Sequence, residues 1–326
     1  MRSDGIAAIT LPTPFAIGRV NSYLIEGEPL TLVDPGPRSG EALAELEAGL
    51  ALHGRRLADV GLVVLTHQHI DHVGLAQTVK ERSGAELAAP APLAGYLADV
   101  DASMDADDSF AAAVMELHGV PEEAIAALRD VVRAFRTFVT SAEVDRPLDE
   151  GDTIRLSARR LDVHFRPGHS PTDTIFVDPE TRVALVGDHV LAEISSNPVL
   201  HRRPGGPVDP RLRPRALANY LNSLERTAEL DLVELLPGHG PPVIGHRALI
   251  EERVEFHRLR KERIFDELRE GPMTAYSIAL ALWGDIAVQQ VYLTLSEAIG
   301  HLDLLVSERR VRELERDGTI EFEGVY

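Results

Sequence analysis

A histidine-rich heptapeptide, residues 66–72 (THQHIDH), holds three imidazoles and one carboxylate, the usual ligands of zinc and related divalent cations, within six positions. The apolar run VGLVVL stands directly before it and predicts a buried strand that ends where these groups begin. If His67 and His69 continue that strand, its period of two places both rings on one side. Asp71 and His72 then follow at the start of the next helix, and a solvated turn capped by Asp71 is the alternative. The crowding of the imidazoles favours a bound cation.

Three later segments offer further ligand-type residues in a similar setting. In each of them a run of β-type residues leads into a turn that contains glycine and then into a histidine or an aspartate, as happens when strands end at a common sheet edge. The three residues are His169 in RPGHSP, Asp188 in VGDH and His239 in PGHG. Each segment alone is ordinary turn chemistry. Together with the heptapeptide, they predict one metal site.

These motifs resemble those of the metallo-β-lactamase fold superfamily of hydrolases, and THQHIDH, PGHS, GDH and PGHG occur here in the family's order. The resemblance covers about residues 5–245 and implies an α/β fold, a four-layer αββα sandwich with a two-metal centre at one edge of its sheets. In that arrangement three residues hold one metal, three hold the other, and one bridges both. Carried over to this sequence, these are His67, His69 and His169; Asp71, His72 and His239; and Asp188. Asp34, in TLVDPG, matches the family's supporting aspartate.

The implied ligand set contains nitrogen and oxygen donors and no thiolate. We therefore expect two divalent metal ions, with zinc favoured and iron or manganese also compatible. Two cations bridged by Asp188 would lower the pKa of a water between them and produce a hydroxide that attacks a carbonyl or phosphoryl centre. Asp188 and Asp71 are the expected catalytic residues. Asp71 would be a ligand when both metals are bound and a proton shuttle when only one is.

The absence of cysteine among the 326 residues excludes disulfides, thiolate ligands and a cysteine nucleophile. The first residues, MRSDG, lack the basic segment and apolar core of a secretory signal. No apolar run is long enough to span a membrane. The cytosol is therefore the expected compartment, with no membrane partner.

The formal charge of −19, from 33 basic and 52 acidic residues, repels polyanions. It disfavours nucleic acid and favours a small-molecule substrate. The leading function is hydrolysis of an ester-like carbonyl, in a thioester or a lactone. The alternative is a phosphodiesterase or ribonuclease of the same fold, since several members of the family cut RNA or DNA. A metal-binding protein without turnover is disfavoured because all seven ligands are present.

The periodicity before residue 90 predicts strands near 6–11, 18–26, 30–34, 60–66 and 85–89 and helices near 40–53 and 73–83. Residues 91–141 are predicted to be largely helical, where the bare fold needs only a short connection. We interpret this stretch as an inserted helical lid over the active site. A packing insertion or a dimer contact is the alternative.

Residues 192–215 form a Pro- and Arg-rich irregular segment that leaves directly from Asp188. Its position predicts substrate contacts. His201, Arg202 and Arg203 could bind a carboxylate or a phosphate, and a solvated basic loop is the alternative. Ser170, beside His169, is a further candidate for orienting the substrate, although a small residue in a turn needs no such role.

We divide the chain into a catalytic domain, residues 1–245, and a helical linker plus a small domain, residues 246–326. The second part is predicted to contain helices at 246–270, 275–283 and 288–317 and a strand at 319–323. It resembles the winged-helix module appended to some hydrolases of the family. Residues 251–326 carry ten basic and sixteen acidic side chains, so DNA binding is disfavoured. Dimerisation, or walling the substrate pocket, is the expected role.

Overall fold

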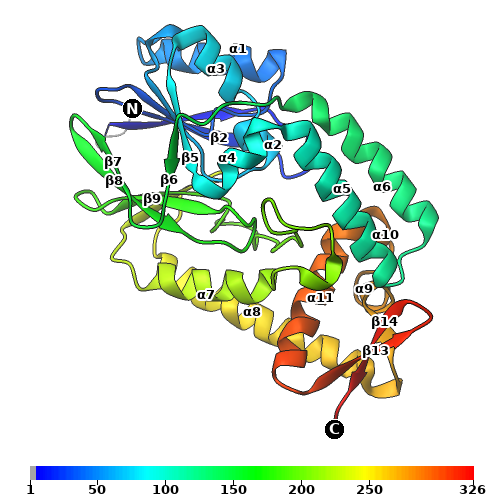
Figure 1. Cartoon of the computed structure of the whole chain (residues 1–326). Helices are drawn as coiled ribbons and strands as arrows, with labels where there is room; N and C mark the ends of the chain where they lie inside the picture. Colours follow the sequence, from blue (N-terminus) through cyan, green and yellow to red (C-terminus); the bar gives the residue numbers. More distant parts are fainter. Residues whose placement is uncertain (1–4) are drawn as a thin grey trace.

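Two β-sheets packed face to face form the centre of the computed structural model, which describes residues 5–326 (Figure 1). The first sheet has the order β1-β2-β3-β4-β5-β6 and the second the order β11-β10-β9-β8-β7. The first comprises β1 (Ile6–Leu11), β2 (Val20–Ile25), β3 (Thr31–Val33), β4 (Leu62–Val64), β5 (Glu86–Pro90) and β6 (Arg146–Leu148). The second comprises β7 (Thr153–Leu156), β8 (Arg159–Phe165), β9 (Thr174–Asp178), β10 (Val183–Gly187) and β11 (Glu234–Pro237). Buried side chains of both sheets, such as Val64 and Phe176, fill the layer between them.

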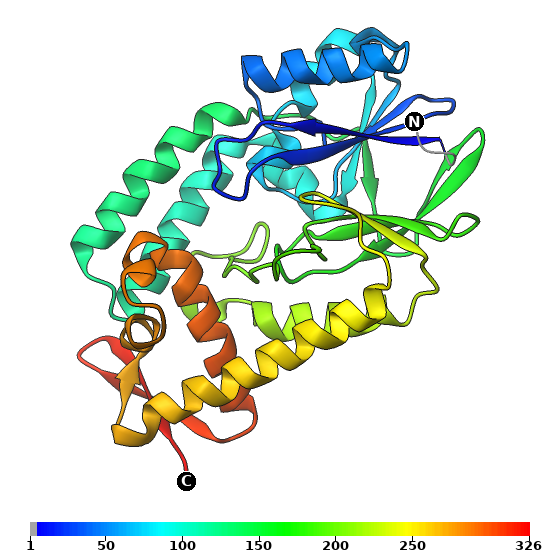
Figure 2. The same ribbon diagram turned by 180° about the vertical axis from the view of Figure 1, so that it is seen from behind.

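Helices cover the outer face of each sheet. The first sheet is covered by α1 (Gly40–Leu52), α3 (Ala76–Ser83) and α4 (Ala91–Ala98). The second is covered by α7 (Ala216–Ala228) and the first turns of α8 (His246–Glu267), which run below it in Figure 2. Buried leucines of these helices, such as Leu46 and Leu224, share hydrophobic clusters with the strands. The expected four-layer αββα sandwich is confirmed.

Strand β4 is shorter than the sequence pattern predicts. All of its residues are buried, as expected for a parallel strand covered on both faces. It ends at Val64, and α2 begins at Ile70 and ends at Val73. His67 and His69 therefore lie on the connecting loop, and the idea that they continue the strand is wrong.

The segment MRSDG, on which the expectation about a secretory signal rests, falls mostly on residues 1–4, and these lie outside the described residues. Within residues 5–326, none of the helices combines the length and the hydropathy needed to cross a bilayer.

The stretch 91–141 is helical, as expected, and contains α4, α5 (Val100–Leu117), α6 (Glu122–Phe135) and the short η2 (Arg136–Phe138). Helices α5 and α6 lie beside the C-terminal helices (Figure 1). Their buried side chains, including Phe110 and Met115, belong to the same hydrophobic cluster as Leu302 and Phe322 near the C-terminus. This stretch is thus a packing element joined to the C-terminal part, and its action as a lid stays a prediction.

The C-terminal part contains α8, a short turn η4 (Leu268–Glu270), three helices and a small sheet. The helices are α9 (Ala275–Trp283), α10 (Asp285–Gln289) and α11 (Val291–Ser307). The sheet has the order β12-β14-β13, with β12 (Met273–Thr274), β13 (Val311–Arg316) and β14 (Thr319–Gly324). The resemblance to a winged helix, and the domain division at residue 245, stay predictions.

The expected helix over 288–317 is wrong in its second half, because residues 311–316 form a strand. Asp317 and Gly318 both adopt positive φ, 50° and 81°, and connect β13 to β14 as a two-residue hairpin turn. An Asp-Gly pair between strands is typical of this turn. Charged residues of β13 form ion pairs across the hairpin instead of lying on the face of a helix. Arg312, for example, pairs with Glu323, which lies opposite it on β14.

Candidate metal centre

All seven predicted ligands gather at one edge of the sandwich, on the loops and the short helix α2 that follow four strand ends. His67, His69, Asp71 and His72 follow β4 of the first sheet. His169, Asp188 and His239 follow β8, β10 and β11 of the second sheet. Each sheet therefore contributes ligands from its own side of the edge. The face-to-face packing of the sheets brings these segments together, although they are far apart in the sequence.

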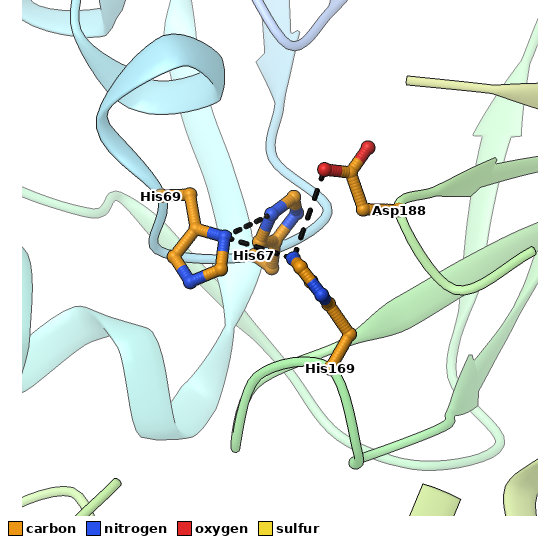
Figure 3. Close-up of side chains that lie close together, drawn as sticks. All are labelled: His67, His69, His169 and Asp188. Carbon is orange, nitrogen blue, oxygen red and sulfur yellow. Dashed lines mark hydrogen bonds and ion pairs between the residues drawn. The ribbon is translucent and has the colours of Figure 1, made fainter. Parts of the chain in front are cut away.

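One group of donors consists of three imidazoles and a carboxylate (Figure 3). His69 Nδ1 lies 3.1 Å from His67 Nε2 and 3.0 Å from His169 Nε2. Asp188 Oδ2 lies 3.7 Å from His169 Nε2. Ligand atoms of one tetrahedral zinc ion are separated by about 3.3 Å, given zinc–nitrogen distances near 2.0 Å. The spacing of these four atoms fits a single divalent cation.

A second group lies on the other side of Asp188. His72 Nε2 is 3.5 Å from Asp188 Oδ1, and His239 Nε2 is 3.2 Å from Asp71 Oδ2. Among the described residues, His72 Nε2, His239 Nε2 and Asp188 Oδ1 are buried polar atoms without a hydrogen-bond partner. Unsatisfied buried donors and acceptors are costly, and a cation between them satisfies all three. This group also fits a divalent cation.

The outer nitrogens of four histidine rings are hydrogen-bonded to oxygen atoms. His67 Nδ1 pairs with Thr66 Oγ1 at 2.9 Å, and His72 Nδ1 pairs with Asp34 Oδ2 at 2.9 Å. Backbone carbonyls accept from the other two rings. His169 Nδ1 lies 3.0 Å from Asn197 O, and His239 Nδ1 lies 2.8 Å from Arg19 O. An acceptor at the outer nitrogen keeps the proton there and turns the lone pair of the inner nitrogen toward a metal.

Asp34 connects two of the sequence motifs. Its Oδ1 accepts a hydrogen bond from Thr66 N at 2.9 Å, and its Oδ2 accepts from Thr66 Oγ1 at 2.7 Å in addition to His72. The residue has a φ of 51°, a conformation that aspartate tolerates better than most side chains. Asp34 thus lies where the resemblance implies, behind the site, and it orients His72.

Gly238, in the PGHG motif, is required by close packing. A Cβ at this position would lie 2.4 Å from Asp188 Oδ1 and 2.5 Å from His72 Cε1. Any side chain would therefore displace two of the predicted ligands. The glycine permits β11 to end directly against the second group of donors.

The protonation states differ between the two donor groups. Burial, together with the neighbouring imidazoles, holds the pKa of His67 and His69 well below the usual histidine value. Burial alone would raise the pKa of Asp188, but the nearby His72 and His239 hold it well below its usual value. Burial would lower the pKa of His72 and His239, but Asp188 and neighbouring carboxylates raise it, in His72 well above the usual value. A cation that binds the second group therefore displaces protons from these two rings.

Two of the other sequence candidates have structural roles. Arg202 is buried, and its guanidinium pairs with Asp107 of α5 at 2.7 Å. Ser170 is buried and donates to Asp173 Oδ1 at 2.7 Å within the turn that carries His169. These contacts within the protein favour the alternatives to substrate binding, and the roles of Arg202 in binding an anion and of Ser170 in orienting substrate stay predictions.

His201 and Arg203 lie near the centre with different exposure. The His201 ring is 5.9 Å from the ring of His69, and burial lowers the pKa of His201 to about 3. Arg203 is exposed and lines a cavity of about 600 Å³ together with Arg213 and Arg215. A role of this cavity in anion binding stays a prediction.

The structure also brings together residues that no sequence motif singled out. Asn197 and Arg19 contribute through backbone carbonyls, which leave no signal in side-chain identity. A further donor group, His257, Glu297 and His301, lies between α8 and α11. His257 Nδ1 pairs with His301 Nε2 at 3.2 Å, so these rings satisfy each other without a cation.

Proteins of one superfamily are similar to this chain. A sequence profile described as the metallo-beta-lactamase superfamily matches residues 16–239. The probable metallo-hydrolase YqjP of Bacillus subtilis (strain 168) is 33% identical over 322 residues, which cover 99% of this chain and 98% of that protein. The crystal structure of metallo-beta-lactamase family protein TTHA1429 from Thermus thermophilus has a TM-score of 0.83 at 27% identity, covering 98% of this chain and 99% of that chain. The hydroxyacylglutathione hydrolase GloC of Haemophilus influenzae is 25% identical over 158 residues, 48% of this chain and 59% of that protein.

Proposed function

This chain belongs to the metallo-β-lactamase superfamily and is a metal-dependent hydrolase, and we propose that it uses two divalent cations to hydrolyse an ester-like carbonyl, in a thioester or a lactone. The observation that carries the proposal is the position of Asp188 between two separate groups of donors. Its Oδ2 lies 3.7 Å from His169 Nε2 and 3.5 Å from His239 Nε2, and its Oδ1 lies 3.5 Å from His72 Nε2. A carboxylate shared in this way suits a pair of cations rather than one.

The roles of the residues follow from this arrangement. His67, His69 and His169 would hold one cation, and Asp71, His72 and His239 the other. A bound pair supplies Lewis acidity and lowers the pKa of water. The nitrogen-rich donor set suits zinc, and iron or manganese is compatible with it.

Asp188 and Asp71 are the two carboxylates that we assign to catalysis. Asp188 is buried and ionised, so it contributes a fixed negative charge between the two groups. Asp71 Oδ2 lies 3.2 Å from His239 Nε2 at the side of the centre that α2 borders. With both cations bound, Asp71 would be a ligand; with only one bound, a carboxylate in that place can accept a proton from the attacking water and deliver it to the leaving group.

Three observations support a carbonyl substrate. Arg202, the buried cation of the segment that follows Asp188, is paired with Asp107 and is not available to a phosphate backbone. A partly apolar cavity borders the same segment. The relative GloC is by its name a hydroxyacylglutathione hydrolase, and a glutathione thioester contains a carbonyl of this class. The net charge of −19 adds to these by repelling polyanions.

The alternative, a phosphodiesterase, has one observation in its favour. The cavity of about 600 Å³ beside the His169 loop is lined by Arg203, Arg213 and Arg215. Arg213 is paired with Asp303, but within the part of the chain that the structure describes Arg203 and Arg215 have no ion pair. Two free guanidinium groups could contact phosphates.

A turnover panel with the metal-loaded protein tests the proposal. Neutral acyl thioesters, lactones, an aryl phosphodiester and single-stranded RNA are compared for wild type, Asp188→Asn, and the exposed control Asp231→Asn. We expect turnover of a thioester or lactone that is lost in Asp188→Asn and retained in the control. Turnover of the phosphodiester or RNA alone would establish the alternative, and full activity of Asp188→Asn would exclude the two-cation assignment.

A further inference from the structure

A cavity of about 370 Å³ opens between residues 193–197 and the C-terminal helices α8 to α11. Figure 2 shows α8 passing the irregular chain that follows β10, with α10 and α11 at its side. The volume lies in the range of small-molecule sites. The cavity is distinct from the two donor groups, because none of the seven predicted ligands lines it.

The cavity and the metal centre share one wall. The segment 193–197 leaves from the loop of Asp188, and Ser196 Oγ donates to the Asp188 carbonyl. At the next residue along the wall, Asn197 O accepts from His169 Nδ1 at 3.0 Å. A molecule that occupies this cavity therefore touches the chain segment whose Ser196 and Asn197 contact the predicted ligands Asp188 and His169.

Much of the lining is apolar and open to solvent. Ile194, Phe256, Ile286 and Leu293 line the cavity and are 48%, 38%, 52% and 39% exposed. Large apolar side chains that gather around a concave surface mark a binding site. The lining is suited to a hydrocarbon chain.

One cation in the cavity is free and held in place. The Arg260 guanidinium lies 5.0 Å from the ring centroid of Phe256 and 5.1 Å from that of Trp283. No carboxylate of residues 5–326 lies within ion-pair distance of it, whereas neighbouring Arg253 is bound by Glu252 and by the Ala192 carbonyl. Two aromatic faces fix the plane of Arg260 and leave its N–H edge for an anion.

The surrounding charges favour a singly charged anion over a doubly charged one. Two carboxyl groups, Glu193 and Glu297, line the same cavity, and Glu297 is close enough to Arg260 for their charges to interact. A phosphate dianion would meet these carboxyl groups with only one free guanidinium to neutralise it. A carboxylate matches the two parallel N–H groups of a single arginine.

We propose that this cavity binds an arm of the substrate that is apolar next to the reacting carbonyl and carries a carboxylate at its far end, with Arg260 binding that carboxylate. The inference rests on the proposed carbonyl hydrolysis and adds the chemical class of the substrate. The substrate is thus a thioester or ester of amphipathic character, with its charge at a fixed distance from the bond that breaks. The apolar residues bind the chain, and Arg260 sets the preference for an acidic terminus.

Binding can be measured without turnover, because Trp283 is the single tryptophan of the chain and stacks on Arg260. The fluorescence of the metal-loaded protein is titrated with hexanoate and octanoate and with their neutral amides, hexanamide and octanamide. We expect at least one carboxylate to bind roughly 10- to 100-fold more tightly than its amide, as hydrogen bonds to charged groups do. The preference should be lost in Arg260→Gln and retained in Arg263→Gln, an exposed arginine on the same helix that does not line the cavity.

Kinetics then identify the arm. Two series of thioesters are compared, one with the carboxylate at the end of the acyl chain and one with it on the thiol, each beside a neutral analogue. A higher kcat/KM for the carboxylated member of either series, removed by Arg260→Gln mainly through KM, supports the proposal. Equal values for charged and neutral members, or an equal loss with both in Arg260→Gln, overturns it. Turnover of the neutral thioesters reports on carbonyl hydrolysis separately, so its failure is distinguishable from failure of the cavity assignment.

Discussion

The metal centre and the cavity beside it are built from side chains in opposite states. In the centre nearly every polar atom points at a partner or at the position of a cation, and the rings are oriented by acceptors such as Asp34 and Asn197 O. In the cavity, apolar side chains are exposed and Arg260 has no carboxylate within ion-pair distance among the described residues. The difference agrees with the two proposed roles. The donor atoms of the centre are arranged for cations, whereas the apolar side chains and the guanidinium of the cavity are available to a substrate.

The largest effect on activity is expected when one histidine is removed from either donor group. We expect His169→Ala and His239→Ala each to lower turnover roughly a thousandfold or more, because each removes a ligand and leaves the other group in place. Metal content measured by mass spectrometry should fall from two ions per chain toward one in each variant. Two ions bound by both variants would contradict the assignment of the two groups.

Asp34→Asn tests whether the orientation of a ring matters as much as the ligand itself. Asparagine tolerates the positive φ at this position, so the backbone is preserved. Its amide places a donor opposite His72 Nδ1, which favours the tautomer that carries a proton on the inner nitrogen. We expect metal affinity to fall roughly 10- to 100-fold, measured by competition with a chelating dye. Asp130→Asn, at an exposed position on α6, serves as the control, and an unchanged affinity in Asp34→Asn would show that the ring is held by packing alone.

On the cavity side, Ile286→Ser should change substrate binding without changing the centre. Ile286 lines the cavity and is half exposed, so its loss removes apolar contact worth about 1 kcal/mol and should raise KM about fivefold. Val288, on the same helix α10 with similar exposure, does not line the cavity and is the matched control. The measurement is KM and kcat on the best thioester together with metal content. A fall in metal content in Ile286→Ser would contradict the claim that the cavity can be altered without affecting the metal centre.

The smallest effect is expected at Glu297 and appears in stability. Burial raises the pKa of this carboxyl group from 4.5 to about 7, so the folded state favours the neutral form. Its contribution to stability is complete below pH 4.5 and is lost as the pH rises through 7. Glu297→Gln removes this dependence and should raise Tm by a few degrees relative to wild type at about pH 8.5, with less gain at about pH 5. Thermal unfolding monitored at both pH values checks this, and an equal difference at both would mean that the carboxyl group is solvated.

Several features of the fold were predictable because they follow local rules. The helix expected at 40–53 is α1, and the strand expected at 6–11 is β1. The extent of β4 was overestimated because an apolar run does not show where backbone pairing stops. The second strand of the C-terminal hairpin was expected, but its first strand, β13, was missed because its charged residues also match a helix face, although the Asp317-Gly318 pair carried the signal.

The gathering of the donor residues could be predicted from the sequence motifs and the family resemblance that they carry. Metal ligation needs particular donor atoms, and those atoms occur in short motifs whose order and glycine neighbours are visible in the chain, as in PGHG. Only the folded molecule shows which arginine side chains lack an ion pair and which oxygen atoms accept hydrogen bonds from the histidine rings. Arg202 meets Asp107, Arg19 O meets His239, and Arg260 lies between Phe256 and Trp283 through packing of separate helices and loops. These pairings depend on which segments pack against each other across the fold, and that information is distributed over the whole chain.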